Sequence, residues 1–274
     1  MIELPEAAVL ARQLGVTVSG KTISNVIAAR SPHKFAWYFG DPQGYAALLT
    51  GMVVGDAASY GGQVEIGAGN ARILFSDGVN LRYAGKGGTP PEKHQLLLEF
   101  DDGSFLVGSV QMYGGLMAFP EGQNDNKYYL VAKEKPSPLT DRFDECYFAT
   151  LSDGDSAGLS LKAFLATEQR IPGLGNGVLQ DILFNARMHP KRKAGSLSAA
   201  ERKSLFAAIK VTLAEMLDGG GRDTENNLLG APGGYRTKLS RNTEGQACQV
   251  CGTPIRKEAY MGGSIYYCAG CQRM

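Results

Sequence analysis

Four cysteines near the C-terminus have the spacing of a metal site. Two Cys-x-x-Cys pairs are separated by sixteen residues, and their members are Cys248, Cys251, Cys268 and Cys271. Such pairs supply four thiolates, the ligand set of a tetrahedral structural zinc ion. Two disulfides or a redox dithiol would use the same residues, but the symmetry of the two pairs favours zinc. We expect one zinc ion in a closed site with a structural role.

The segment between the two cysteine pairs is typical of a β-hairpin. Gly252 follows the first pair and lets the loop fold back, so that backbone amides face the sulfurs. Residues 261–264 read Met-Gly-Gly-Ser, a turn sequence. Strand-forming residues stand on both sides of this turn: Ile255, Tyr260, Ile265, Tyr266 and Tyr267. The sequence predicts a two-stranded ribbon with its tip near Gly262 and Gly263.

Two acids near the N-terminus are the next candidates for chemistry. Glu3 and Glu6 lie at the start of a predicted helix over residues 4–14, which Pro5 suits at its first turn and Gly15 at its end. Acids in a first turn interact with the free helix amides. From the residues alone, both are first-turn glutamates that satisfy helix amides.

A glycine-containing turn provides a third candidate. Residues 171–176 read Ile-Pro-Gly-Leu-Gly-Asn. Gly173 and Gly175 allow a close approach to the backbone, and a helix beginning at Asn176 would expose its positive end. The pattern suits a phosphate-binding turn. The alternative is that the turn only joins two helices, because short glycine motifs are weak signals.

The composition limits the kinds of protein that this chain can be. The 274 residues contain 28 Lys and Arg against 27 Asp and Glu, a balance unlike the basic footprint of most nucleic-acid binders. Residues 186–210 are locally basic, and Lys191 and Arg192 are among their seven cations, against one acid. No apolar run has membrane-spanning length, and no secretory leader opens the chain. We expect a cytoplasmic protein.

Short β-rich segments followed by helical ones indicate two different regions. Alternation and turn residues predict strands at 17–29, 35–39, 46–54, 63–66, 71–75, 79–84, 95–100, 104–112 and 128–132. Their spacing favours an antiparallel sandwich or barrel. After a linker at 133–138, apolar periodicity predicts helices at 142–149, 160–168, 177–187 and 198–217. A polar, mobile loop is expected from 219 to about 235.

Two further residues, Trp37 and Lys86, could have a structural or a functional role. Trp37 lies among aromatic residues and is predicted to belong to the core. Lys86, in a Gly-Lys-Gly-Gly loop, is a candidate amine or DNA-groove contact, and the alternative is an ordinary exposed turn lysine.

The order of these motifs resembles the formamidopyrimidine-DNA glycosylase and endonuclease VIII family. The resemblance covers essentially the whole chain and is strongest over 165–190 and 248–272. The residues that carry it are Glu3-Leu-Pro-Glu6, Pro90-Pro-Glu-Lys-His94, Ile171–Asn176, Ile182-Leu-Phe184, Met188-His-Pro190 and the four cysteines. It implies an α+β fold. An N-terminal helix and antiparallel β-sandwich would span 1–135, a helix–two-turn–helix domain with its loop 136–235, and a zinc ribbon 236–274.

The resemblance also implies a function. The chain would be a base-excision-repair DNA glycosylase that releases a damaged or modified base, acting as a bacterial-type, nucleoid-associated monomer on damaged double-stranded DNA. Glu3 would act as general acid or base at the sugar, and Glu6 would orient the N-terminus. Asn176 would hold a backbone phosphate, with Gly173, Gly175, Lys191 and Arg192 as further DNA contacts.

The chain departs from the family pattern at several positions. The family's nucleophilic N-terminal proline corresponds to Ile2, which makes AP-lyase activity doubtful. If Met1 is retained, its amine lies one residue out of register; if it is removed, Ile2 presents a primary amine. Tyr60 stands where the family has a strand lysine, and Gly263 stands where it has a ribbon arginine. Of the family's three duplex-filling residues, two are replaced by Asp77 and Gln111, and only the aromatic one remains, as Tyr113. The alternative function is a degenerate homologue that binds DNA or another structured nucleic acid without chemistry.

Overall fold

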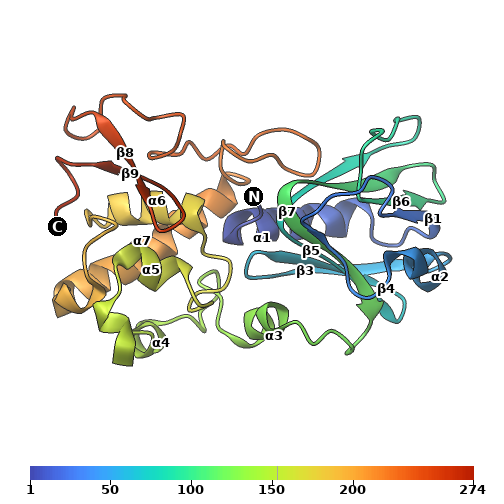
Figure 1. Cartoon of the computed structure of the whole chain (residues 1–274), viewed down its shortest axis with the longest axis horizontal. Coiled ribbons are helices and arrows are strands. Elements are labelled where there is room, and N and C mark those ends of the chain that lie inside the picture. Colours follow the sequence, from blue (N-terminus) through green and yellow to red (C-terminus); the bar gives the residue numbers. More distant parts are fainter. Residues whose placement is uncertain (153) are drawn as a thin grey trace.

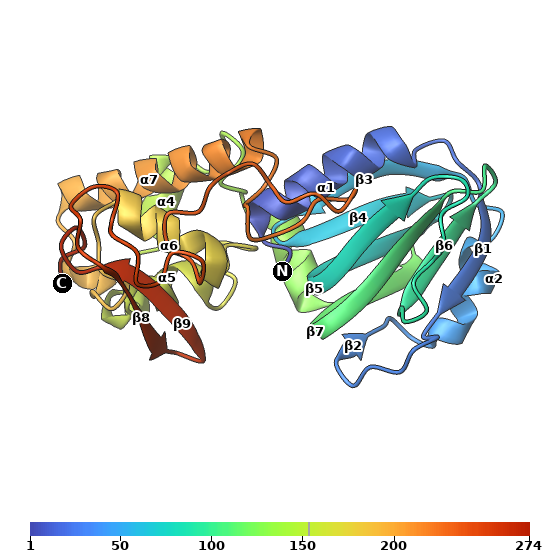
Figure 2. The same cartoon turned by 90° about the horizontal axis from the view of Figure 1, so that it is seen from above.

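The computed structural model describes residues 1–152 and 154–274, which form two lobes with the N-terminus between them (Figure 1). The first lobe is a curved sheet with helix α1 (Leu4–Thr17) across one face (Figure 2). The second lobe combines helices with a two-stranded ribbon. The predicted α+β class is confirmed. Among the described residues, no helix combines the length and apolar character needed to cross a membrane.

Within the described residues, one seven-stranded sheet forms the first lobe, in the order β1-β6-β7-β5-β4-β3 with β2 beside β7. Of the strand pairs described in it, only β2–β7 is parallel. The register of the long β5–β7 pair shifts between Asp77 and Val79, a bulge at which both strands can bend. The strands are β1 (Ile23–Ala28), β2 (Ala36–Trp37), β3 (Val54–Tyr60), β4 (Gln63–Ala68), β5 (Ala71–Ala84), β6 (Leu96–Phe100) and β7 (Phe105–Pro120).

Helix α1 packs its apolar face onto β3 and β4. Ala7, Leu10 and Leu14 recur at helical spacing and are buried with Val64 and Ile66 in the main core of this lobe. The N-cap is Glu3, whose backbone amide donates to Glu6 Oε2 at 3.3 Å in a capping box. The expected N-terminal helix is confirmed, and it extends beyond Gly15.

Two predicted strands are helices instead. The segment 46–54 contains α2 (Tyr45–Leu49), which follows the 3₁₀ turn η1 (Pro42–Gly44), and the segment 128–132 lies in α3 (Lys127–Glu134). The Asn126 side chain accepts hydrogen bonds from the amides of Tyr128 and Tyr129 and so starts α3. This local cap outweighs the β-propensity of the residues that follow.

The predicted strand at 35–39 is reduced to the short β2. Its Trp37 is 45% exposed, so the prediction that this residue belongs to the core is wrong.

The second lobe contains the four helices predicted between residues 142 and 217. They are α4 (Glu145–Thr150), α5 (Leu161–Ala166), α6 (Asn176–Asn185) and α7 (Ala199–Asp218), with 3₁₀ turns η2 (Gly154–Gly158) and η3 (Ala194–Ser196). Each helix contributes to their shared core, with Phe148, Phe164, Ile182 and Leu205 among its buried members. A capping box between Ser198 and Glu201 begins α7.

The C-terminal ribbon forms as predicted. Strands β8 (Ile255–Tyr260) and β9 (Gly263–Cys268) pair antiparallel, and Met261 and Gly262 make the turn between them. Both residues of the turn have positive φ, near +50° for Met261 and +70° for Gly262. In Figure 2 the ribbon projects from the second lobe beside α5 and α6.

The segment 219–235 crosses from the second lobe to the first. Leu228 is fully buried in the core of the first lobe. Its amide donates to Gln13 Oε1 at 2.9 Å, and its carbonyl accepts from the Tyr83 amide at 3.0 Å. Arg82 Nη1 also donates to the Asn227 carbonyl at 2.9 Å. This loop, which the sequence suggested was mobile, is anchored in its middle.

Glycines bring the two lobes into direct contact. Gly173 has a φ of +79°, and a Cβ added there would lie 2.1 Å from the Gly62 nitrogen. The Gly173 carbonyl accepts from the Leu4 amide at 2.9 Å. A residue other than glycine at 173 would therefore strain its own backbone and separate the lobes.

We expect Gly173→Ala to lower the free energy of unfolding by at least about 1–3 kcal/mol, the cost of one strained residue, because the clash adds to the unfavourable φ. Gly85→Ala is the matched control, since Gly85 has an ordinary φ and open space around it. Urea unfolding monitored by circular dichroism measures both. Equal stabilities of the two variants would contradict the role of Gly173.

Candidate active site

A cavity of about 500 Å³ opens between the two lobes beside the N-terminus. Its walls come from the first residues of the chain, strands β5 and β7, the start of α6 and the segment that follows α7. The wall residues that matter chemically are Met1, Ile2, Glu3, Glu6, Gln111, Asn176, Arg222 and Glu225. Glu3 near the N-terminus and Asn176 in the second lobe, both singled out from the sequence, therefore meet at one cavity.

Glu3 joins the first residues of the chain to the start of α6. Its Oε1 accepts from the Gly177 amide at 2.9 Å, and its Oε2 accepts from the Val178 amide at 2.8 Å. The side chain is buried. The carboxylate thus satisfies two free amides at the positive end of α6.

Arg222 lies between the two N-terminal glutamates. Its Nε and Nη2 donate to the two oxygens of Glu6 at 2.9 and 2.7 Å, and its backbone amide reaches Oε1 at 3.2 Å. Its Nη1 lies 3.6 Å from Glu3 Oε2. All three side chains are buried. One guanidinium therefore serves two carboxyls and is bidentate only with Glu6.

The surroundings of Glu3 shift the pKa of its carboxyl. Burial raises the pKa of the Glu3 carboxyl above its ordinary value, the Arg222 guanidinium opposes this rise, and the Glu6 charge adds to it. Burial alone would lower the pKa of Arg222, but Glu3 and Glu6 together raise it. Arg222 is thus the fixed cation. Glu3 is the carboxyl whose pKa moves toward neutral pH, the direction that acid–base catalysis needs.

The N-terminal amine lies at the same cavity. The α-ammonium group of Met1 forms an ion pair with Glu225 Oε2, and the Tyr113 hydroxyl lies 3.8 Å from Met1 Sδ. Ile2 is buried, and its amide donates to the Asp77 carbonyl at 2.6 Å. With Met1 in place, Ile2 offers a bonded amide and the amine at the cavity is that of Met1.

The glycine-containing turn is packed against these residues. A Cβ on Gly175 would lie 2.5 Å from Glu3 Cδ, and Gly173 contacts the other lobe. The amides of Gly177 and Val178, which an open phosphate site would need, are taken by Glu3. In the structure Gly173 and Gly175 permit close packing, and the helix end binds an internal carboxylate. Their contact with DNA stays a prediction.

Asn176 lies where the cavity meets the ribbon. Its Nδ2 donates to the Ser264 carbonyl at 2.9 Å, while its Oδ1 is buried with no hydrogen-bond partner in the described structure. Gln180, one turn later, donates to the same carbonyl at 3.2 Å and accepts from the Tyr266 amide at 3.1 Å. One face of α6 thus holds strand β9 in place.

The other predicted cations lie away from the cavity walls. Lys191 forms an ion pair with Glu258 of the ribbon. Arg192 is bidentate with Glu201 at 2.7 and 2.9 Å. Lys86 is exposed on a loop of the first lobe. The structure brings Ile2, Glu3, Glu6 and Asn176 together and leaves these three cations outside.

Lysines stand next to two positions where the resemblance expected basic residues. The Nζ of Lys133, on α3, lies 4.8 Å from the centre of the Tyr60 ring. A Cβ on Gly263 would lie 3.5 Å from the Nζ of Lys162, which donates to the Tyr260 carbonyl at 2.6 Å. A positive charge is thus retained beside each position, although it comes from a different element.

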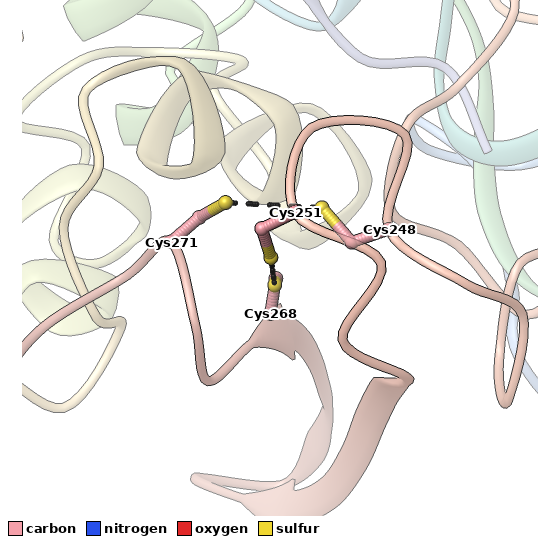
Figure 3. A group of neighbouring side chains, drawn as sticks. All are labelled: Cys248, Cys251, Cys268 and Cys271. Atoms are coloured by element: carbon pink, nitrogen blue, oxygen red, sulfur yellow. Dashed lines mark hydrogen bonds between the residues drawn. The ribbon is translucent and has the colours of Figure 1, made fainter.

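The four C-terminal cysteines gather at the base of the ribbon (Figure 3). Their sulfurs all lie within 4.8 Å of one another, with Cys248 and Cys271 3.8 Å apart and Cys251 and Cys268 3.4 Å apart. The spacing suits four ligands around one metal ion. Gly252 adopts a φ of +72°, and the Val250 amide points to Cys248 Sγ at 3.4 Å, as the first knuckle requires.

Sequence reasoning missed Arg222 and Glu225. Both lie in a glycine-rich segment that resembled a mobile loop. One signal was present in the sequence, because Glu3 and Glu6 lie in a turn whose other residues are apolar. Such a turn is expected to be buried, and two buried acids need a cation as partner. Nothing in the sequence identified which of the 28 basic residues it was.

We expect Arg222→Met to lower the free energy of unfolding by about 3–5 kcal/mol, because it leaves two buried carboxyls without their cation. Arg12→Met is the control, since Arg12 is exposed on α1. Thermal unfolding at neutral pH compares the two. A variant of Arg222 as stable as the Arg12 variant would contradict the assigned ion pairs.

Comparisons with known proteins agree with this architecture. A sequence model of the formamidopyrimidine-DNA glycosylase H2TH domain matches residues 135–227. The formamidopyrimidine-DNA glycosylase of Symbiobacterium thermophilum is 31% identical over 99% of this chain and 89% of its own length. The enzyme of the same name from Methylococcus capsulatus is 29% identical over the full length of both chains.

Solved structures share the fold. MutM (Fpg) protein from Thermus thermophilus superposes with a TM-score of 0.81 and 25% identity over 98% of both chains. Lactococcus lactis Fpg, solved with DNA containing an abasic site, has a TM-score of 0.84 and 22% identity over 99% of this chain and 100% of its own. Together with the full-length sequence similarity, these findings show that the chain belongs to the formamidopyrimidine-DNA glycosylase family.

Proposed function

We propose that the protein is a DNA glycosylase that releases a damaged or modified base by cleaving its N-glycosidic bond. The observation that carries this proposal is the cavity between the lobes, where buried Glu3 and the chain's free amine lie together. Family membership supports the same reaction, because the full-length relatives are named DNA glycosylases. The relative from Lactococcus was solved with DNA, which supports DNA as the partner.

Glu3 is proposed as the residue that acts at the sugar. Departure of a base leaves positive charge on the sugar ring, and a nearby carboxylate stabilises that charge. The group formed by Glu3, Glu6 and Arg222 carries one more negative than positive charge when both acids are ionised. The raised pKa of Glu3 also makes its carboxylate a stronger base toward an attacking water than an exposed glutamate.

The nucleophile distinguishes simple hydrolysis from strand cleavage. An imine intermediate, which permits strand cleavage, needs an unprotonated amine at the reacting carbon. While Met1 is retained, Ile2 has no free amine, and the Met1 amine is held in an ion pair with Glu225. Hydrolysis by water activated at Glu3 is therefore the main proposed route, and AP-lyase activity would depend on the Met1 amine leaving Glu225.

The metal is proposed to be one zinc ion bound by Cys248, Cys251, Cys268 and Cys271. Four thiolates leave no open position for substrate, so the ion would stabilise the ribbon and take no part in the reaction. The ribbon in turn contacts Asn176 and Gln180 at the edge of the cavity. Asn176 is the proposed phosphate contact, and zinc would act on DNA binding only by holding β9 against α6.

We expect Glu3→Gln to abolish base release, because the amide can neither accept the proton nor carry the negative charge. Glu92→Gln, at an exposed acid, is the control. Oligonucleotides with oxidised purines, oxidised pyrimidines and abasic sites form the panel. Borohydride trapping and intact-mass analysis of the N-terminus identify any imine and the amine that forms it. DNA binding without base release by the unsubstituted protein would favour the degenerate binder instead.

Removing one metal ligand tests the zinc assignment separately. We expect Cys268→Ser to lose stoichiometric zinc in metal analysis and to unfold at a lower temperature, because the ribbon loses the crosslink at its base. Cys146→Ser is the matched control, since Cys146 is exposed on α4. Unchanged zinc content in the Cys268 variant would contradict the four-sulfur site.

A further inference from the structure

An exposed aromatic surface lies on the first lobe next to the cavity. Phe35 is 48% exposed, Trp37 is 45% exposed and Met112 is 67% exposed. Large apolar side chains gathered on a surface mark interaction sites more often than chance exposure does. We call Phe35, Trp37 and Tyr113 the aromatic platform.

Backbone pairing with β7 places β2 next to Tyr113. β2 pairs in parallel with β7 at Gly114 and Gly115, and the Gly114 amide donates to the Phe35 carbonyl at 3.0 Å. A Cβ on either glycine would meet β5, at Val79 for Gly114 and at Ser76 for Gly115. The ring of Trp37 meets Tyr113, with 5.8 Å between ring centres and 35° between ring planes.

The platform is continuous with the cavity. Tyr113 reaches from Trp37 to Met1, whose Sδ is 3.8 Å from the tyrosine hydroxyl, and Met1 and Met112 belong to the cavity walls. In Figure 2 the β2 loop and the β8–β9 ribbon project toward the same side, one from each lobe, with the N-terminus between them. A strand entering the cavity would therefore pass the platform on the sheet side.

The charge at the Trp37 end of the platform suits a nucleic-acid strand, whereas the acids Asp77 and Glu3 act on Tyr113 at the cavity end. Residues 30–39 contain Arg30, His33 and Lys34 but no acid. Lys34 and Arg30 are exposed, and the Lys34 Nζ lies 5.3 Å from the centre of the Phe35 ring. Cations interleaved with exposed rings are the arrangement by which proteins hold unpaired strands, with phosphates on the cations and bases on the rings.

We propose that the aromatic platform, centred on Trp37, stacks an unpaired base of the bound DNA next to the nucleotide held in the cavity. The inference rests on the proposed function for the identity of the partner. It goes beyond that function by assigning a second binding position, outside the cavity, and a preference for DNA with an unpaired base beside the target. Removal of one base–aromatic stack is expected to weaken binding about tenfold or more.

The only tryptophan of the sequence makes the proposal directly measurable. We expect Trp37 fluorescence to be quenched by DNA carrying an unpaired base, with the same midpoint as binding measured by anisotropy of a labelled strand. Trp37→Ala should bind this DNA about tenfold more weakly, and Trp37→Phe, which keeps a ring, should lose less. Tyr128→Ala, at an exposed aromatic residue of α3, is the control and should bind normally.

The outcomes separate this inference from the proposed function. The platform would be overturned if DNA is bound tightly or a base is released while Trp37 fluorescence is unchanged. It would also be overturned if Trp37→Ala and Trp37→Phe bind DNA equally well. Either result would leave the glycosylase proposal standing. Absence of binding to every DNA tested would overturn both. Quenching by unpaired DNA, with a smaller effect of fully paired duplex, supports the platform whether or not a base is released.

Discussion

The carboxylate of Glu3 is the point on which the rest of the structure depends. It accepts two backbone hydrogen bonds from the start of α6 and also lies beside Arg222, so it joins three parts of the chain that are distant in sequence. The first residues, the second lobe and the segment after α7 all converge on this side chain. Met1 and Ile2, which precede it, are held at the cavity by bonds to Glu225 and to the Asp77 carbonyl.

Burying these charged groups is an energetically unfavourable way to hold two lobes together. Two acids and one arginine lose their hydration when they are buried, and an apolar cluster of equal size would often stabilise the fold as well or better. The buried charges are instead explained by what the cavity does. They keep a carboxyl with a raised pKa in a fixed place at the cavity, and the glycines at 173 and 175 let the turn pack closely against it.

Local signals in the sequence predicted much of this molecule. The cysteine spacing located the sulfur cluster, and apolar periodicity located the helices of the second lobe. Glu3, Glu6 and Asn176 were candidates because the motifs that contain them resemble those of the family. Predictions failed where a side-chain cap outweighed propensity, as at Asn126, and where one contact joined distant segments. The burial of Arg222 and the exposure of Trp37 both depend on the tertiary pairing of β2, β7 and the crossing loop, which no window of sequence contains.

The location of the first amine also limits how the chain can be fused to others. Any residue joined to the Met1 nitrogen would turn the ammonium group paired with Glu225 into a neutral amide and would place new peptide inside the cavity. The opposite end has no such restriction, because Met274 is 74% exposed beyond the last cysteine. A purification tag or partner domain joined to the C-terminus would leave the cavity open, whereas one joined to the N-terminus would occupy it.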